Sequence, residues 1–245
     1  MITVYIYAKI YGYPIYSRST LKEAALAIFF AIPPLMTPLI IVGGIVAGFF
    51  TPTEASAIAV MYSLALGVFG YRTIKGKDIP KVFYDSARFA AISLFCIGTA
   101  SAFGWLLAYY KIPFAIVEFL KPFGVGAIST GLIVAGAFLF IGMFIDAIPA
   151  IIILGTVLWP LGEFAGMHPI HFAIIGVISL AFGLVTPPYG LCLLIACAVG
   201  EIKVVQALKD VGVILLPMLC VLMFVIFLPE VILWLPRAFM PSYIG

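Results

Sequence analysis

Charged side chains are scarce in this chain of 245 residues: aspartate, glutamate, lysine and arginine make up 9% of it, whereas 65% is hydrophobic. Soluble domains are typically about 25% charged and about 45–50% apolar. A soluble globular domain is therefore excluded, because the chain cannot present polar groups to water all round. We expect an all-α integral membrane protein that crosses the bilayer several times.

Groups that could carry enzyme chemistry are also few. His168 and His171 lie three residues apart without a third metal ligand, and we interpret both as structural. The sequence has no Ser/His/Asp set and no glycine-rich phosphate loop. The four cysteines lie in apolar runs without metal-ligand spacing: Cys96, Cys192, Cys197 and Cys220. The net charge of +3 is small and dispersed, so we expect no nucleic-acid partner. Since Asp146 is the only acid deep in an apolar stretch, we also expect no enzyme, and no bound cofactor.

Apolar runs divide the chain into helical elements. We expect helices at 24–50, 55–71, 88–110 and 113–120, two arms at 127–145 and 147–161, a broken element at 171–199 and a last helix at 211–234. The small polar patch 98–101 is expected to interrupt the 88–110 helix, and the basic stretch 72–85 to lie along the membrane surface. The apolar opening 1–8 would form only about 12 Å of helix, so we interpret it as the tail of a longer one.

Basic residues predict the orientation of these helices. By helix parity, ten lysines and arginines fall on one face, whereas only Lys111, Lys121 and Arg237 fall on the other. The positive-inside rule makes the first face cytoplasmic and places the turn at Thr51–Glu54 outside. Parity does not distinguish two full crossings at 127–161 from a re-entrant hairpin, because both return the chain to the same side.

The segment Thr51-Pro52-Thr53-Glu54 has the pattern of a helix start. Thr51 suits the N-cap, Pro52 the first helical position and Glu54 the reciprocal position of a capping box. A direct ligand role for Glu54 is the alternative to structural capping.

Asp146 separates the two apolar arms of 127–161. A charge at bilayer depth costs roughly 2.5–3.5 kcal/mol on insertion scales, which makes this aspartate a candidate functional residue. Capping of the second arm, with Pro149 near its start, is an equally favoured interpretation.

Thr186-Pro187-Pro188 breaks the element at 171–199. Neither proline has an N–H, so the carbonyls of Gly183 and Leu184 lose their helical partners. A dehydrated Na⁺ held by carbonyl oxygens and the Thr186 hydroxyl could replace those partners. A plain proline kink, whose carbonyls meet water or neighbouring helices, is the alternative.

Four motifs in the order of the chain carry a family resemblance. They are Gly43-Gly44-Ile45 running into Gly48, Phe50-Thr51-Pro52-Thr53-Glu54-Ala55, Gly142-Met143-Phe144-Ile145-Asp146, and Gly183-Leu184 before Thr186-Pro187-Pro188 and Gly190. The chain resembles the C-terminal half of the large membrane subunit of tripartite ATP-independent periplasmic (TRAP) transporters.

The resemblance implies half of an elevator-type importer of the ion-transporter superfamily, with one re-entrant helical hairpin and one broken transmembrane helix. It implies scaffold-type helices and an interfacial arm at 1–84, a transport-type region at 85–200, and a C-terminal transmembrane helix and tail at 201–245. The implied function is Na⁺-coupled import of an organic acid such as a C4-dicarboxylate, across a bacterial or archaeal inner membrane. The implied partners are a small four-helix membrane subunit, a periplasmic binding protein and an N-terminal repeat in cis or in trans.

Site residues follow from the resemblance by position. The implied Na⁺ site comprises Gly142, Ile145, Asp146, Gly183, Leu184, Thr186 and Pro187, and the substrate-facing candidates are Pro188, Tyr189, Gly190 and Cys192. Two positions depart from the common family pattern. Cys192 stands where many members have asparagine and offers no amide contact, and Ala147 follows Asp146 where proline is common.

Two other classes compete with a transporter. Broken helices also line channel pores, and a channel would conduct without coupling to a Na⁺ gradient. A structural membrane subunit is the second alternative, although fewer paired breaks are expected of it.

Overall fold

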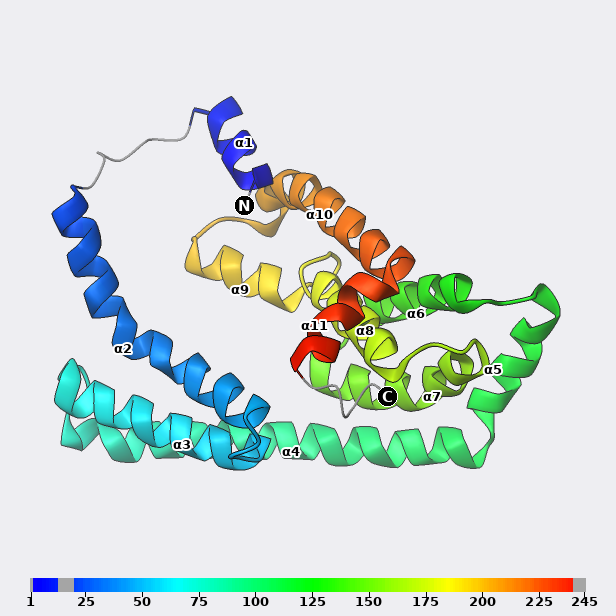
Figure 1. Cartoon of the computed structure of the whole chain (residues 1–245), viewed down its shortest axis with the longest axis horizontal. Helices are drawn as coiled ribbons and strands as arrows, with labels where there is room; N and C mark the ends of the chain where they lie inside the picture. The colour runs from blue at the N-terminus through cyan, green and yellow to red at the C-terminus, as the bar shows by residue number, and fades with distance from the viewer. Residues whose placement is uncertain (1, 13–19, 240–245) are drawn as a thin grey trace. The chain divides into compact units, whose positions relative to one another are not determined.

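The structure is a computed structural model that describes residues 2–12 and 20–239, and within these ranges it contains helices and no strand (Figure 1). Five helical segments of the described chain are long and apolar enough to cross a membrane: Leu21–Val46, Pro52–Gly70, Gly76–Tyr109, Ala147–Phe164 and Val204–Phe227. The expected all-α class and several membrane crossings are therefore supported.

The chain divides into two compact units, one with Tyr11–Ala90 and the other with Ala91–Ala238 and the residues up to Ile10. The first unit holds α2 (Leu21–Val46), α3 (Pro52–Ala65), a π-helical turn η1 (Leu66–Gly70), a 3₁₀ turn η2 (Gly76–Asp78) and the start of α4 (Ile79–Tyr109). The division predicted at residues 84 and 200 remains a prediction.

In the first unit α2 lies along α3, and tyrosines link α2 to the segment that follows it. Tyr62 donates a hydrogen bond to the carbonyl of Pro33 at 2.9 Å. Tyr71 donates to the carbonyl of Phe30 at 2.6 Å. Since Pro34 has no N–H to offer that carbonyl, the tyrosine replaces the donor that the helix lacks.

Helix α4 corrects two expectations. It runs unbroken from Ile79 to Tyr109, so the patch 98–101 does not interrupt it and residues 79–85 are its first turns rather than a separate surface element. The Thr99 hydroxyl is satisfied within the helix, through the carbonyls of Phe95 at 3.1 Å and Cys96 at 3.0 Å. A small hydroxyl residue of this kind needs no break in the helix.

The second unit continues with α5 (Ile112–Leu120), η3 (Lys121–Phe123), α6 (Ala127–Gly142), α7 (Ala147–Phe164), α8 (Pro169–Gly183), α9 (Leu191–Val199), α10 (Val204–Phe227) and α11 (Pro229–Phe239). It also includes α1 (Ile2–Ile10), where Tyr7 contacts Asp210 of α10. The core lies among α6, α7, α8 and α10 and includes Val134, Phe138, Leu158, Ile175, Leu180 and Ile226.

The last expected helix, 211–234, divides in two. Helix α10 ends at Phe227 and α11 begins at Pro229, with Leu228 between them in a non-helical conformation. Pro229 has no N–H to bond the carbonyl of Val225, four residues earlier. Buried His171 of α8 supplies the donor instead, with its Nε2 atom 2.8 Å from that carbonyl oxygen.

Candidate functional site: the junction of the hairpin tip and the helix break

The hairpin tip is the turn Met143–Asp146 between α6 and α7. The amides of Phe144 and Ile145 both donate to the carbonyl of Ile141 at 2.9 Å, which closes the end of α6. Asp146 occupies the N-cap position of α7, with φ −65° and ψ 159°, but its side chain makes no capping hydrogen bond. Within the described residues its carboxylate is exposed and has no partner. Asp146 therefore occupies the capping position by its backbone, while its side chain does not cap the helix.

The helix break lies between α8 and α9 and spans Leu184–Gly190, slightly longer than the segment 186–190 that the sequence predicts. Thr186 folds back on α8: its hydroxyl donates to the carbonyl of Phe182 at 2.7 Å and its amide to that of Gly183 at 2.9 Å. Gly190, with φ +47°, starts α9, and a side chain there would lie 3.0 Å from the Thr186 carbonyl oxygen. Glycine is therefore required at this close approach.

The tertiary structure brings the tip and the break together. A Cβ on Gly183 would lie 2.5 Å from the carbonyl oxygen of Leu139 and 2.8 Å from the Cα of Gly142, so α6 and α8 touch backbone to backbone. The amide of Tyr189 donates to the carbonyl of Met143 at 3.2 Å, which links the break to the tip directly. The two motifs, about 40 residues apart in the sequence, form one junction.

The carbonyls of Gly183 and Leu184, at the start of the break, find partners within the protein. The carbonyl of Gly183 accepts from Thr186, and that of Leu184 accepts from the amide of Cys192 at 3.1 Å, across the break. Their loss of helical partners is confirmed, but they are not left without a donor. A carbonyl oxygen has two lone pairs, so each keeps one for a further ligand.

Oxygen atoms at the junction suit a small hard cation. The Thr186 hydroxyl donates its hydrogen bond to the carbonyl of Phe182, which leaves the lone pairs of the hydroxyl oxygen available. The Asp146 carboxylate has no described partner. Carboxylate, carbonyl and hydroxyl oxygens are the ligands that hard cations prefer.

The remaining candidates differ in exposure. Ile145, Pro188, Tyr189 and Cys192 are exposed and Gly190 is buried, whereas Thr186 and Pro187 are half-buried. Met143 was missed in the sequence analysis, because its contribution is a backbone carbonyl whose partner lies on another helix. No side-chain pattern signals such a contact.

The motif at the start of α3 lies outside this junction and is structural. Thr51 is the N-cap, and its hydroxyl accepts from the Glu54 amide at 3.3 Å. The Glu54 carboxylate accepts from the Thr51 amide and hydroxyl at 2.8 Å each. The predicted capping box with Pro52 in the first turn is confirmed, and the carboxylate already has two donors.

Known proteins resemble the chain over almost its whole length. The family model described as tripartite ATP-independent periplasmic transporter, DctM component, matches residues 1–231. The C4-dicarboxylate TRAP transporter large permease protein DctM of Pseudomonas aeruginosa is 33% identical over 237 residues, which cover 97% of this chain and 56% of that protein. The sialic acid TRAP transporter large permease protein SiaM of Vibrio cholerae is 29% identical over 240 residues, 98% of this chain and 56% of that protein.

A third relative, the uncharacterized protein YgiK of Salmonella typhimurium, is 35% identical over 237 residues, 97% of this chain and 54% of that protein. The chain thus spans about half the length of the curated relatives it matches.

Fold and junction define a multi-pass helical membrane protein with a hairpin and a broken helix in contact. The chain belongs to the DctM family of TRAP transporter large permease subunits, as the motifs predicted. Members of this family are transporters and not enzymes.

Proposed function

We propose that the chain is the C-terminal half of a permease that couples Na⁺ entry to the import of an organic acid. The junction of the hairpin tip with the helix break would hold the ion beside the substrate. The hydrogen bond from the Tyr189 amide to the Met143 carbonyl is the observation that carries this proposal, because it joins the two interrupted elements at their polar ends. Interrupted helices that meet in this way provide ion and substrate sites in secondary transporters.

The coupling ion is inferred from the oxygen atoms at the junction. The Asp146 carboxylate, the Thr186 hydroxyl and the carbonyls of Gly183 and Leu184 offer oxygen lone pairs that no described donor occupies. An unpaired carboxylate in a membrane is costly, so a bound cation would stabilise it. Na⁺ binding at these oxygens would in turn hold the hairpin against the break.

The substrate class is inferred from the relatives and from the start of α9. The relatives' names specify C4-dicarboxylates, sialic acid and 2,3-diketo-L-gulonate, all of them acids. The first amides of α9 follow Gly190 and present the positive end of a helix dipole, which favours an anionic group. Tyr189 and Cys192 are exposed there and would line the substrate side.

Partners follow from the family. A small membrane subunit, a periplasmic binding protein and a first repeat, in cis or in trans, would complete the transporter in the bacterial or archaeal inner membrane. The elevator mechanism and the re-entrant course of α6 and α7 belong to the same proposal.

The test is uptake of labelled sialic acid and C4-dicarboxylates into proteoliposomes that hold the permease containing this chain, together with its partners. We expect uptake with an inward Na⁺ gradient and little with K⁺ in its place. Asp146→Asn and Thr186→Ala should each reduce Na⁺-driven uptake by about tenfold, the effect of losing one charge-assisted contact. Thr186→Ser, which keeps the hydroxyl, should retain uptake.

Asp78→Asn is the matched control, because this acid lies in the first compact unit and its carboxylate accepts from the Lys75 amide. It should leave uptake unchanged. Normal uptake by Asp146→Asn and Thr186→Ala at equal expression would contradict the site. Uptake that ignores the Na⁺ gradient would contradict the coupling, and conductance without coupling would identify a channel.

A further inference from the structure

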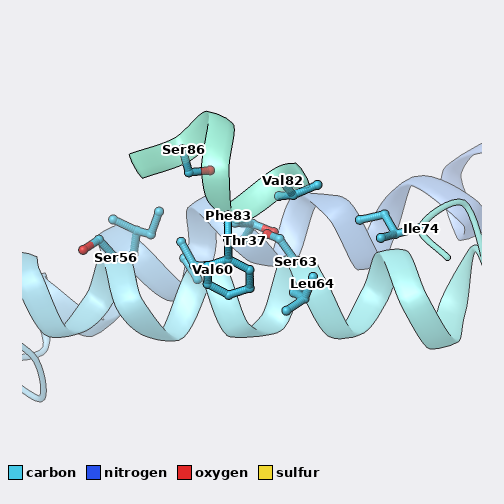
Figure 2. Close-up of a pocket in the computed structure, with 11 residues that line it drawn as sticks. Thr37, Ser56, Val60, Ser63, Leu64, Ile74, Val82, Phe83 and Ser86 are labelled. Atoms are coloured by element: carbon cyan, nitrogen blue, oxygen red, sulfur yellow. The ribbon is translucent and has the colours of Figure 1, made fainter. Parts of the chain in front are cut away.

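A cavity lies wholly within the first unit, among α2, α3 and the start of α4. Its volume is about 580 Å³, within the roughly 300–1,000 Å³ typical of ligand pockets. Seven of its eleven lining residues have hydrocarbon side chains, among them Ile41, Val60 and Phe83. Figure 2 shows the lining side chains coming from all three helices, with Thr37 on α2, Ser56 to Leu64 on α3 and Val82 to Ser86 on α4.

The cavity is elongated and open. Along α3 it extends from Ser56 to Leu64, which corresponds to about 12 Å of helix, and it continues to Ile74 beyond the helix end. Val60 and Phe83 line it and yet are 63% and 62% exposed, so its wall is not closed by the described chain. A long flexible hydrocarbon chain suits this shape.

Basic residues flank Ile74 along the chain. Arg72, Lys75, Lys77 and Lys81 are exposed on the segment that contains Ile74, and no described residue forms an ion pair with them. These four basic residues outnumber the two acids nearby, Asp78, which accepts a hydrogen bond from the Lys75 amide at 3.0 Å, and half-buried Asp85. The segment therefore keeps a net positive charge beside an apolar cavity.

The basic segment is held in place against the end of α3. The amides of Thr73 and Ile74 both donate to the carbonyl of Gly67, at 3.0 and 3.2 Å. The Ile74 side chain packs so closely on Gly67 that a Cβ there would lie 2.7 Å from the Ile74 Cδ1. The charges and the cavity thus form one preorganised feature.

We propose that this cavity binds one acyl chain of an anionic phospholipid, with the phosphate among Lys75, Lys77 and Lys81. The distribution of basic residues places this end of α3 at the cytoplasmic leaflet, whose anionic lipids attract basic segments. Within a bilayer the hydrocarbon contacts alone give little selectivity, because the surrounding lipid tails are equally apolar. The lysines therefore determine which lipid is retained.

The test is native mass spectrometry of the permease containing this chain, titrated with phosphatidylglycerol or phosphatidylethanolamine. We expect the anionic lipid to bind about tenfold more tightly, on the basis of three lysines near the phosphate. The triple variant Lys75→Gln, Lys77→Gln, Lys81→Gln should lose this preference. Lys203→Gln with Lys209→Gln, which removes basic charge elsewhere, should keep it.

A second variant tests the cavity itself. Ser63→Phe adds bulk to the lining and should weaken both lipids, whereas Met61→Phe adds it on an exposed part of the same helix that does not line the cavity, and should weaken neither. Equal affinity for the two lipids in the parent, or unchanged binding in Ser63→Phe, would overturn the proposal. A Ser63→Cys variant gives a further test. Cross-linking of this cysteine to a protein helix, and not to a photoactivatable phospholipid, would also overturn the proposal.

Discussion

Proline removes a backbone donor wherever it follows a helical turn, and in a membrane the orphaned carbonyl needs a partner from the protein. The Tyr71 hydroxyl donates to the carbonyl of Phe30, which Pro34 leaves without a helical donor. His171 donates to the carbonyl of Val225, which Pro229 leaves without one. Because a carbonyl only accepts, Nε2 of His171 carries the proton in this contact. This hydrogen bond supports the interpretation of His171 as a structural residue.

The contact predicts the effect of replacing His171. His171→Phe removes the donor and leaves a buried carbonyl unpaired, which should lower the free energy of unfolding by about 1–3 kcal/mol. His171→Gln can still donate and should recover part of the loss. Thermal unfolding of the purified protein in detergent measures both.

His168→Asn is the control for His171. His168 Nδ1 accepts from the Ile170 amide at 3.2 Å as the N-cap of α8, and asparagine is an equally good N-cap. We expect little change in its unfolding. A stability of His171→Phe equal to that of the parent would contradict the role assigned to this histidine.

At the scale of elements, glycine contacts determine how α6 and α8 meet. Gly142 and Gly183 allow the two backbones to touch, and Gly176 accepts the Phe138 ring, since a Cβ there would lie 3.1 Å from the ring. Small residues permit such close approach between membrane helices, where burial from water contributes no attraction. The hairpin is therefore held at its tip by shape as well as by the hydrogen bond to Met143.

Gly183→Ala should disrupt this contact. The added methyl would lie 2.5 Å from the Leu139 carbonyl oxygen, so α6 and α8 must move apart, at a cost of about 1–3 kcal/mol in unfolding free energy. Uptake should fall together with stability, because the junction opens. Thermal unfolding and transport assays on the same preparation measure the two effects.

Gly136→Ala is the matched control on α6. Apart from the adjoining backbone of its own helix, no described atom lies within 4 Å of a Cβ at this exposed position, so the variant should be as stable as the parent or more stable by up to about 1 kcal/mol. If both alanine variants behave alike, close packing at Gly183 does not hold the junction.

At the scale of the whole molecule, the basic residues determine the orientation in the membrane. The predicted cytoplasmic segment is Arg72–Arg88, and the turn Thr51–Glu54 is predicted to lie outside. Helix α3 and the turn η1 connect these two segments and together are long and apolar enough to cross the bilayer. One crossing between them is consistent with this orientation.

Cysteine labelling in intact cells tests the orientation. In a background without the four native cysteines, Thr53→Cys should react with a membrane-impermeant maleimide added outside. Lys77→Cys should react only after the membrane is permeabilised. The reverse labelling pattern would show that the orientation is opposite to the predicted one. The proposed lipid site would then lie in the outer leaflet.

Much of the fold could be predicted from the sequence because its determinants are local. Thr51 and Glu54 lie three residues apart, and the break at Thr186–Gly190 follows from two consecutive prolines. The end of α10 at Phe227, two residues before Pro229, carried the same local signal and was missed, because the apolar run continues through it. The break predicted at the patch 98–101 was wrong, because the hydroxyl of Thr99 donates to carbonyls of its own helix.

The sequence by itself indicated a helical membrane protein that resembles TRAP permeases, the capped helix start at Thr51, and the break at Thr186–Gly190. These properties depend on composition and on neighbours within a few residues. Only the tertiary structure decided that the break meets the hairpin tip, that Met143 accepts from Tyr189, and that His171 serves Val225. Such contacts join residues from about 40 to 54 positions apart, and their distances depend on how helices pack, which no local pattern specifies.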